Sequence, residues 1–234
     1  MRGLCHVGLV RSENLHDSFL YADTMLERSH KACESDIGAM YSVVYEITRN
    51  KLDTLIDFSL ENFQWISRSA RDTPNAYVES LIEYMRTTFS CLAPMDEGSR
   101  TGLHFSACGH VAERLVRLLT DPPESKAVSN LPPISRIDAF GLKNLALDVQ
   151  EFEKFADTTG VPQLGECFNE LKCLTEAMID RDLPFLLQAG NENVRRRKYP
   201  LLSLEKVVNI LEKYNGLGLV CSHEEESNLS LLQI

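Results

Sequence analysis

The spacing of apolar residues predicts helices along almost the whole chain. Apolar positions recur at three- and four-residue steps, as expected for helices that turn one face toward a core. Alternation of apolar and polar residues, the mark of a half-buried strand, is almost missing. The pattern predicts helices over about 15–63, 74–93, 103–120, 137–156, 164–178 and 203–214, and one short helical turn at 185–189.

Capping residues and prolines indicate where several of these helices begin and end. Asp72-Thr73-Pro74 predicts a start, because a capping oxygen precedes a proline at the first helical position. Asp121-Pro122-Pro123 predicts a stop, and Ser203 is expected to cap the last helix. The expected divisions are a poorly ordered N-terminus at 1–14, a helical sub-bundle at 15–120, a Pro-rich loop at 121–133, a second sub-bundle at 134–216 and an acidic tail at 217–234.

The segment Ile137–Ala156 has two helical stripes, whereas an ordinary surface helix has one. The first stripe is apolar and consists of Leu142, Leu145, Val149, Phe152 and Ala156. The second mixes large apolar and polar side chains and consists of Phe140, Asn144, Leu147, Glu151 and Lys154. A mixed stripe is typical of a surface that binds another protein. The alternative is that Phe140 and Leu147 pack on a third helix of the same bundle.

Composition and charge narrow the classes of function. The chain has 234 residues and a formal net charge of −10, which disfavours nucleic-acid binding because that needs a basic surface. Its apolar runs are far shorter than a membrane span requires, and its first residues lack the features of a signal peptide. The seven cysteines are odd in number and show no CxxC spacing, so reduced thiols in a cytoplasmic protein are expected.

Catalytic and metal-binding motifs are not found in the sequence. His104 and Cys108 share a helical face, but no second ligand pair is spaced for zinc, and ordinary packing is the favoured interpretation. The acidic pairs Glu151/Glu153 and Asp180/Asp182 are two residues apart and do not face each other on a helix. The sequence therefore predicts no enzyme, no cofactor and no metal site, with a metal- or thiol-dependent enzyme as the remote alternative.

The strongest charge run is Arg195-Arg196-Arg197-Lys198, which is expected to lie in a loop. Four neighbouring cations can contact anionic lipid headgroups, at about 1 kcal/mol each. The alternative is a solvated loop whose charge is neutralised by acidic residues nearby.

Several segments together carry a resemblance to one known family. The similarity is densest over Ile137–Ala156, with Leu147-Asp148-Val149 at its centre, and continues through Val161-Pro162. It extends to Leu171-Lys172-Cys173-Leu174, Lys198-Tyr199 and Leu211-Glu212-Lys213, and upstream to Tyr45–Trp65, Tyr77–Leu92 and Ser106–His110. In this order and spacing, these segments resemble the C-terminal domain of exocyst complex component six (the Sec-fifteen family). The resemblance covers roughly residues 15 to 215, and the sequence departs from the family pattern after Gly216.

This resemblance implies a fold, a function and partners. The fold is all-α, an elongated multi-helix bundle of the rod-like, stacked type found in tethering complexes. The function is that of a subunit of the exocyst, which tethers secretory vesicles to the plasma membrane, and the partners are GTP-bound Rab GTPases and other exocyst subunits. The protein would be cytoplasmic and peripheral at vesicle and plasma membrane sites, held there through its partners. Phe140, Asn144, Leu147 and Glu151 are the expected Rab contacts; a helical scaffold without Rab recognition is the alternative.

Overall fold

The computed structural model describes residues 4–122 and 131–214, with side chains described from residue 20 onward. Their helices are α1 (Leu4–Leu60), α2 (Ala76–Cys91), α3 (Glu97–Thr120), α4 (Ala139–Thr158), the 3-10 helix η1 (Leu164–Phe168), α5 (Asn169–Ile179), α6 (Leu183–Leu187), α7 (Glu192–Lys198) and α8 (Leu204–Lys213). The predicted all-α fold is confirmed for these residues. The tail at 217–234 lies outside them, as does most of the Pro-rich loop.

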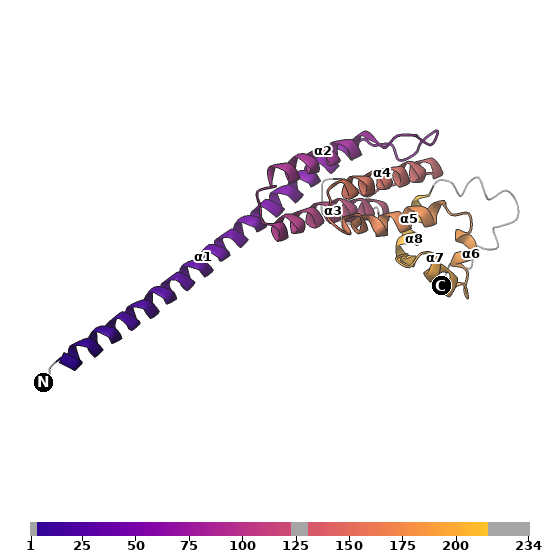
Figure 1. Cartoon of the computed structure of the whole chain (residues 1–234). Helices are drawn as coiled ribbons and strands as arrows, with labels where there is room; N and C mark the ends of the chain where they lie inside the picture. Colours follow the sequence, from indigo (N-terminus) through magenta and orange to yellow (C-terminus); the bar gives the residue numbers. More distant parts are fainter. Residues whose placement is uncertain (1–3, 123–130, 215–234) are drawn as a thin grey trace, which may run out of the picture. The chain divides into compact units, whose positions relative to one another are not determined.

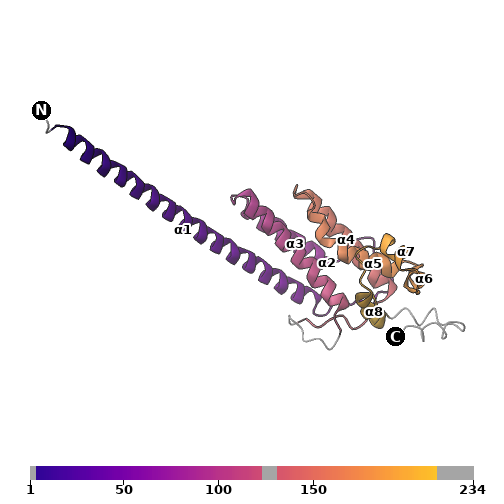
Figure 2. The same ribbon diagram turned by 90° about the horizontal axis from the view of Figure 1, so that it is seen from below.

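The chain divides into two compact units, residues 1–47 and residues 48–234. The second unit is a bundle in which α2, α3 and α4 lie side by side and η1 and α5 pack on α3 and α4 (Figures 1 and 2). These contacts join helices on both sides of the Pro-rich loop. The finer division into two sub-bundles stays a prediction. The poor ordering predicted for residues 1–14 also stays a prediction; α1 begins at Leu4.

The core of the second unit is built from the stripes that the sequence indicates. All five residues of the apolar stripe on α4 are buried, as predicted. Phe152 stacks on Phe168 of η1 with ring centroids 5.2 Å apart. Pro162 and the left-handed backbone at Gln163, with φ of 63°, separate η1 from α4. The predicted helix at 164–178 is therefore a 3-10 turn followed by α5, and the turn places Phe168 against α4.

A polar ladder joins the last turns of α1 to α3. The Nε of Arg49 donates to the Ser106 hydroxyl at 3.1 Å, and Nε2 of His110 lies 2.9 Å from Oδ1 of Asp53. One turn further, Arg114 reaches both carboxylates. Its Nη2 donates to Asp57 at 2.8 Å. Its Nε lies 2.9 Å from the carboxylate of Asp53, an ion pair whose geometry does not make a hydrogen bond. Each rung advances four residues on both helices, so the two helices run parallel in a fixed register.

Two helix starts and one loop differ from the sequence prediction. α2 begins at Ala76 rather than at Pro74, because the cap position is taken by Asn75, whose backbone and side chain are held by a carboxylate on α4. α4 begins at Ala139, where Asp138 caps the N–H of Gly141. The prediction of a loop at Arg195-Arg196-Arg197-Lys198 is wrong, because these residues lie on the helix α7.

The ends of three helices meet at Lys213. Its ammonium group is buried and donates to the carbonyls of Leu119 and Asp121 at the end of α3. The carbonyl of Lys213 accepts the N–H of Ile137 at 2.9 Å, just before α4 begins. Cations at a helix C-terminus stabilise its unpaired carbonyls. Burial lowers the pKa of Lys213 to about 8, although Asp121 and Glu212 act to raise it.

This depressed pKa predicts how stability depends on pH. The ordinary lysine pKa is 10.5, so between pH 8 and 10.5 the unfolded chain binds more protons than the folded chain. The free energy of unfolding should therefore rise with pH across that window, by about 3 kcal/mol from this group. In urea titrations at several pH values, Lys213→Met should be less stable than the wild type at pH 10 and should lack this rise. Parallel pH profiles for the two proteins would contradict the assignment.

Candidate functional site

One side of α4 is covered by the connector, residues 61–75, which joins α1 to α2. Three connector N–H groups, four residues apart, donate to side chains of α4 or its cap. Ser67 donates to Asp138 at 3.2 Å, Arg71 to Asn144 at 2.8 Å and Asn75 to Asp148 at 2.7 Å. An extended segment cannot pair these groups within itself, and each buried unpaired N–H costs about 1–3 kcal/mol. The three acceptors therefore hold the connector against α4.

Asp148 is the central acceptor of this arrangement. It is fully buried and also receives hydrogen bonds from Nδ2 of Asn75 and the hydroxyl of Tyr77, both at 2.7 Å. Burial raises the pKa of Asp148, and the donors from Asn75 and Tyr77 act in the opposite direction. The hydroxyl pKa of Tyr77 is raised by its burial and by the Asp148 carboxylate beside it. The carboxylate thus fixes the end of the connector and the start of α2 at one point.

Gly141 lets the connector approach α4 closely. A Cβ at this position would lie 2.0 Å from the backbone carbonyl oxygen of Trp65. Phe63 packs edge-on to both Trp65 and Tyr77, with ring centroids 4.7 and 5.6 Å away. Only a residue without a side chain fits between the helix and the connector backbone.

The predicted partner-binding residues divide into two groups in the structure. Phe140 is 39% exposed, and the Nζ of Lys143 lies 5.9 Å from the centre of its ring. Leu147 is half-buried, and half-buried Glu151 accepts a hydrogen bond from Lys154 at 3.0 Å. Asn144 is only 7% exposed and its carbonyl oxygen is occupied by Arg71. The outer surface of α4 is therefore Phe140, Lys143, Leu147 and Glu151, and Asn144 supports it from beneath the connector.

Sequence reasoning missed Lys143 as part of this surface, and it missed the connector that covers the neighbouring side of α4. Lys143 stands three residues after Phe140, a spacing that places the two side chains on one face. That signal was present in the sequence. The pairing of the connector with α4 spans more than seventy residues and has no local signature.

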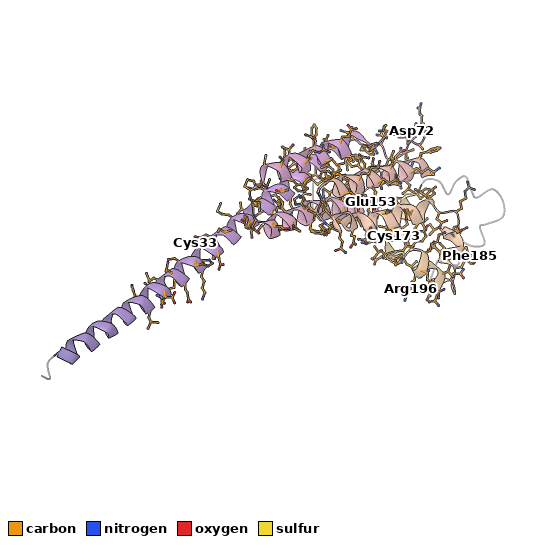
Figure 3. The ribbon with its side chains drawn as sticks, in the orientation of Figure 1. Cys33, Asp72, Glu153, Cys173, Phe185 and Arg196 are labelled. Atoms are coloured by element: carbon orange, nitrogen blue, oxygen red, sulfur yellow. The ribbon has the colours of Figure 1, made fainter. Side chains whose placement is uncertain are left out.

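The four cations of α7 have different surroundings. Arg195 is buried and its guanidinium donates to the carbonyl of Leu186 at 3.2 Å. Lys198 pairs with Asp180 at 2.6 Å, which raises the pKa of its ammonium group and lowers that of the Asp180 carboxyl. Arg196 and Arg197 are exposed and form no ion pair among the described residues. Figure 3 labels Arg196 on α7. Arg195 and Lys198 thus contact other residues of the bundle, whereas Arg196 and Arg197 face solvent.

His104 and Cys108 lie in the core. The Nδ1 of His104 is 2.6 Å from the carbonyl of Arg100, and its ring lies on Phe89 with centroids 3.9 Å apart. Burial lowers the pKa of His104 and raises that of the Cys108 thiol to about 12. Within residues 20–122 and 131–214 no group of three metal-ligating side chains is assembled. Both side chains are buried among the residues of the bundle core.

Comparison with known proteins identifies the family. The family described as exocyst complex subunit Sec15 C-terminal matches residues 10–213. The chain belongs to this family. The resemblance seen in the sequence is thereby confirmed, and the match to the Sec15 C-terminal family extends from within α1 to the last residue of α8.

The curated relatives are exocyst components. Exocyst complex component 6B of Mus musculus and of Homo sapiens are each 25% identical to the chain over 210 residues, which is 87% of this chain and 23% of the relative. Exocyst complex component 6 of Caenorhabditis elegans is 25% identical over 181 residues, 73% of this chain and 21% of the relative. The chain thus spans less than a quarter of the length of these relatives. No solved structure matches it significantly.

Length and hydropathy decide whether a helix can cross a bilayer. Among the helices that the structure describes, none is both long and apolar enough to do so.

The close contact at Gly141 predicts opposite effects for two glycine substitutions. Gly141→Ala forces a methyl group into the Trp65 carbonyl and should lower the free energy of unfolding by about 1–3 kcal/mol. Gly109→Ala is the matched control, because Gly109 also lies within a helix but has open space where its Cβ would stand. It should raise the free energy of unfolding by about 0.5–1 kcal/mol. Urea denaturation measures both, and a neutral Gly141→Ala would remove the connector from close contact with α4.

Proposed function

We propose that this chain acts in the exocyst by binding a GTP-loaded Rab GTPase through the outer surface of α4. The observation that carries the proposal is Phe140, a large aromatic side chain left 39% exposed beside half-buried Leu147. Neither residue belongs to the apolar stripe of α4, all five residues of which are buried. Exposed apolar residues on a rigid element, rimmed by charge, are typical of interaction sites.

The surrounding residues suit recognition of a switch region. In GTPases the switch segments are ordered by the γ-phosphate, so an effector distinguishes the two nucleotide states by contacting that ordered segment. Phe140 and Leu147 supply apolar contacts, while Lys143 and Glu151 supply charges of both signs that orient the partner. The connector holds α4 in place, which lowers the entropy lost on binding.

The proposed role is non-catalytic, without cofactor or metal. The protein would work in vesicle docking before exocytosis, in the cytoplasm and at the vesicle and plasma membrane through its partners. These partners are a Rab GTPase and other exocyst subunits, and no nucleic acid. The alternative is a helical scaffold that joins exocyst subunits without recognising a Rab.

Substitutions on α4 test the Rab proposal. Leu147→Asp places a charge in the apolar centre and should weaken binding of GTP-loaded Rab at least 10-fold, a loss of about 1.4 kcal/mol or more. Phe140→Ala should weaken it by a similar factor. Thr87→Asp is the control, because Thr87 is exposed on α2, away from the outer surface of α4, and should leave the affinity unchanged.

Binding is measured by calorimetry against a panel of Rab proteins loaded with GDP or a non-hydrolysable GTP analogue. Circular dichroism confirms that each variant is folded. If Leu147→Asp and Phe140→Ala both keep the wild-type affinity, α4 is not the interface. If the wild type binds both nucleotide states equally or not at all, the scaffold alternative holds.

We also propose that α7 contacts anionic lipid through two of the four cations named from the sequence. Arg196 and Arg197 are exposed, whereas Arg195 is buried and Lys198 is paired with Asp180. The sequence proposal for Arg195, Arg196, Arg197 and Lys198 is thus narrowed to Arg196 and Arg197. Each cation near an anionic surface contributes about 1 kcal/mol.

Charge reversal at both arginines tests the lipid contact. Arg196→Glu with Arg197→Glu should weaken binding to phosphatidylserine vesicles roughly 30-fold at low salt. Arg28→Glu with Lys31→Glu changes the net charge equally on α1 and serves as the control. Sedimentation with vesicles measures binding, and equal losses for the two double variants would show that net charge alone is responsible.

A further inference from the structure

The described part of α1 in the first unit carries an exposed apolar seam. The seam consists of Leu26, Cys33, Ile37, Met40, Val43 and Ile47. The exposed fractions reach 69% at Leu26, 67% at Met40 and 61% at Ile47. The successive spacings are seven, four, three, three and four residues, which keeps all six side chains on one face of the long helix drawn in Figure 1.

This spacing is typical of a helix that packs against a second helix. Apolar residues repeated every 3.5 positions on average form the seam of a coiled coil, with Leu26, Cys33, Met40 and Ile47 at one core position of the heptad. Val43 falls at the other core position. A helix whose side chains are exposed all round is marginal in water, since most helix stability comes from packing of its apolar face. Residues 20–47 therefore have an apolar face suited to a partner helix.

The charges on this helix indicate the character of that partner. Asp36 occupies the second core position of its heptad, inside the seam, and Asp23 and Glu46 stand at positions that flank the seam. The two cations, Arg28 and Lys31, stand at the outer heptad positions. His30 flanks the seam and is paired with Glu34 at 3.3 Å. Within residues 20–47, the core and flanking positions of the seam therefore include Asp23, Asp36 and Glu46 but no lysine or arginine, because both of these cations lie on the far side of the helix.

This distribution disfavours a second copy of the same chain as the partner. In a parallel pair, Asp36 would face Asp36 within a largely apolar interface, where like charges repel strongly. A helix with lysine or arginine opposite Asp36 and Asp23 would pair these carboxylates instead. Such flanking charges set partner choice and orientation in coiled coils.

We propose that the seam of α1 binds an amphipathic helix of another exocyst subunit, with lysine or arginine at the positions that meet Asp23 and Asp36. The proposal rests on the proposed assembly with exocyst subunits, and not on Rab binding through α4. It assigns to residues 20–47 a separate interaction surface in the first unit.

Photo-crosslinking from the seam tests the partner. The full chain with benzoylphenylalanine at position 33 is illuminated with each other purified exocyst subunit in turn, and the crosslinked peptide is mapped by mass spectrometry. The expected product joins position 33 to one subunit, on an amphipathic helix with basic flanking residues. A product formed only with a second copy of this chain, a partner helix with acidic flanks, or no product with any subunit would overturn the proposal.

Substitutions separate the apolar and the charge contributions. Met40→Lys and Asp36→Lys should each weaken binding to the crosslinked subunit at least 10-fold, and the second should also reduce the salt dependence. Lys31→Glu on the far side should leave the affinity within 2-fold. All three positions are exposed, so the variants should fold, and circular dichroism checks this.

The variants also keep this surface distinct from the one on α4. Affinity for GTP-loaded Rab should be unchanged in Met40→Lys and Asp36→Lys, while Leu147→Asp should keep the affinity for the subunit. Equal binding of Met40→Lys and wild type to the subunit would remove the seam from the interface, whatever the outcome for Rab.

Discussion

The second unit depends on the buried carboxylate of Asp148. It receives three hydrogen bonds, two from Asn75 and one from Tyr77, at the point where the connector ends and α2 begins. A buried charge is tolerated only when such donors replace the water it has lost. Because α2 starts where Asn75 is held, the position of α2 on α4 follows from this one group. The connector then lies along α4, fixed by Asp138 and Asn144 as well.

The same arrangement leaves the other side of α4 available. Helices within a bundle normally bury one stripe and expose charged residues, yet α4 keeps Phe140 and Leu147 at its surface. The connector buries the neighbouring polar face, so α4 is anchored on two sides. A surface held in this way changes little on binding, which favours selection of one partner state over another.

Local patterns predict much of the fold, but they do not predict contacts between residues that are far apart in the sequence. The apolar stripe of α4, the end of α3 before Asp121 and the Ser203 cap of α8 all follow from periodicity and capping chemistry. The start of α2 differs from its prediction because the N–H of Asn75 donates to Asp148, more than seventy residues away, and Asn75 takes the cap position. Periodicity groups Asn144 with the outer stripe. It cannot predict that Asn144 is buried and accepts the N–H of Arg71, because that contact depends on the path of the connector. The charge run at 195–198 does not indicate which of its cations have partners. In the structure Arg195 donates to the carbonyl of Leu186, and Lys198 pairs with Asp180.

Lys213 has a consequence for the Pro-rich loop between α3 and α4. The ammonium group of Lys213 donates to the end of α3, and the backbone carbonyl of Lys213 accepts the N–H of Ile137. The N–H of Ile134 donates to the carbonyl of Leu118. The described residues at both ends of the loop are therefore held by the bundle. The cost of lengthening such a loop grows only with the logarithm of its length, about 0.6 kcal/mol for each doubling. This stretch of sequence can thus diverge in length and composition, or receive an inserted peptide, while the helices on either side keep their register.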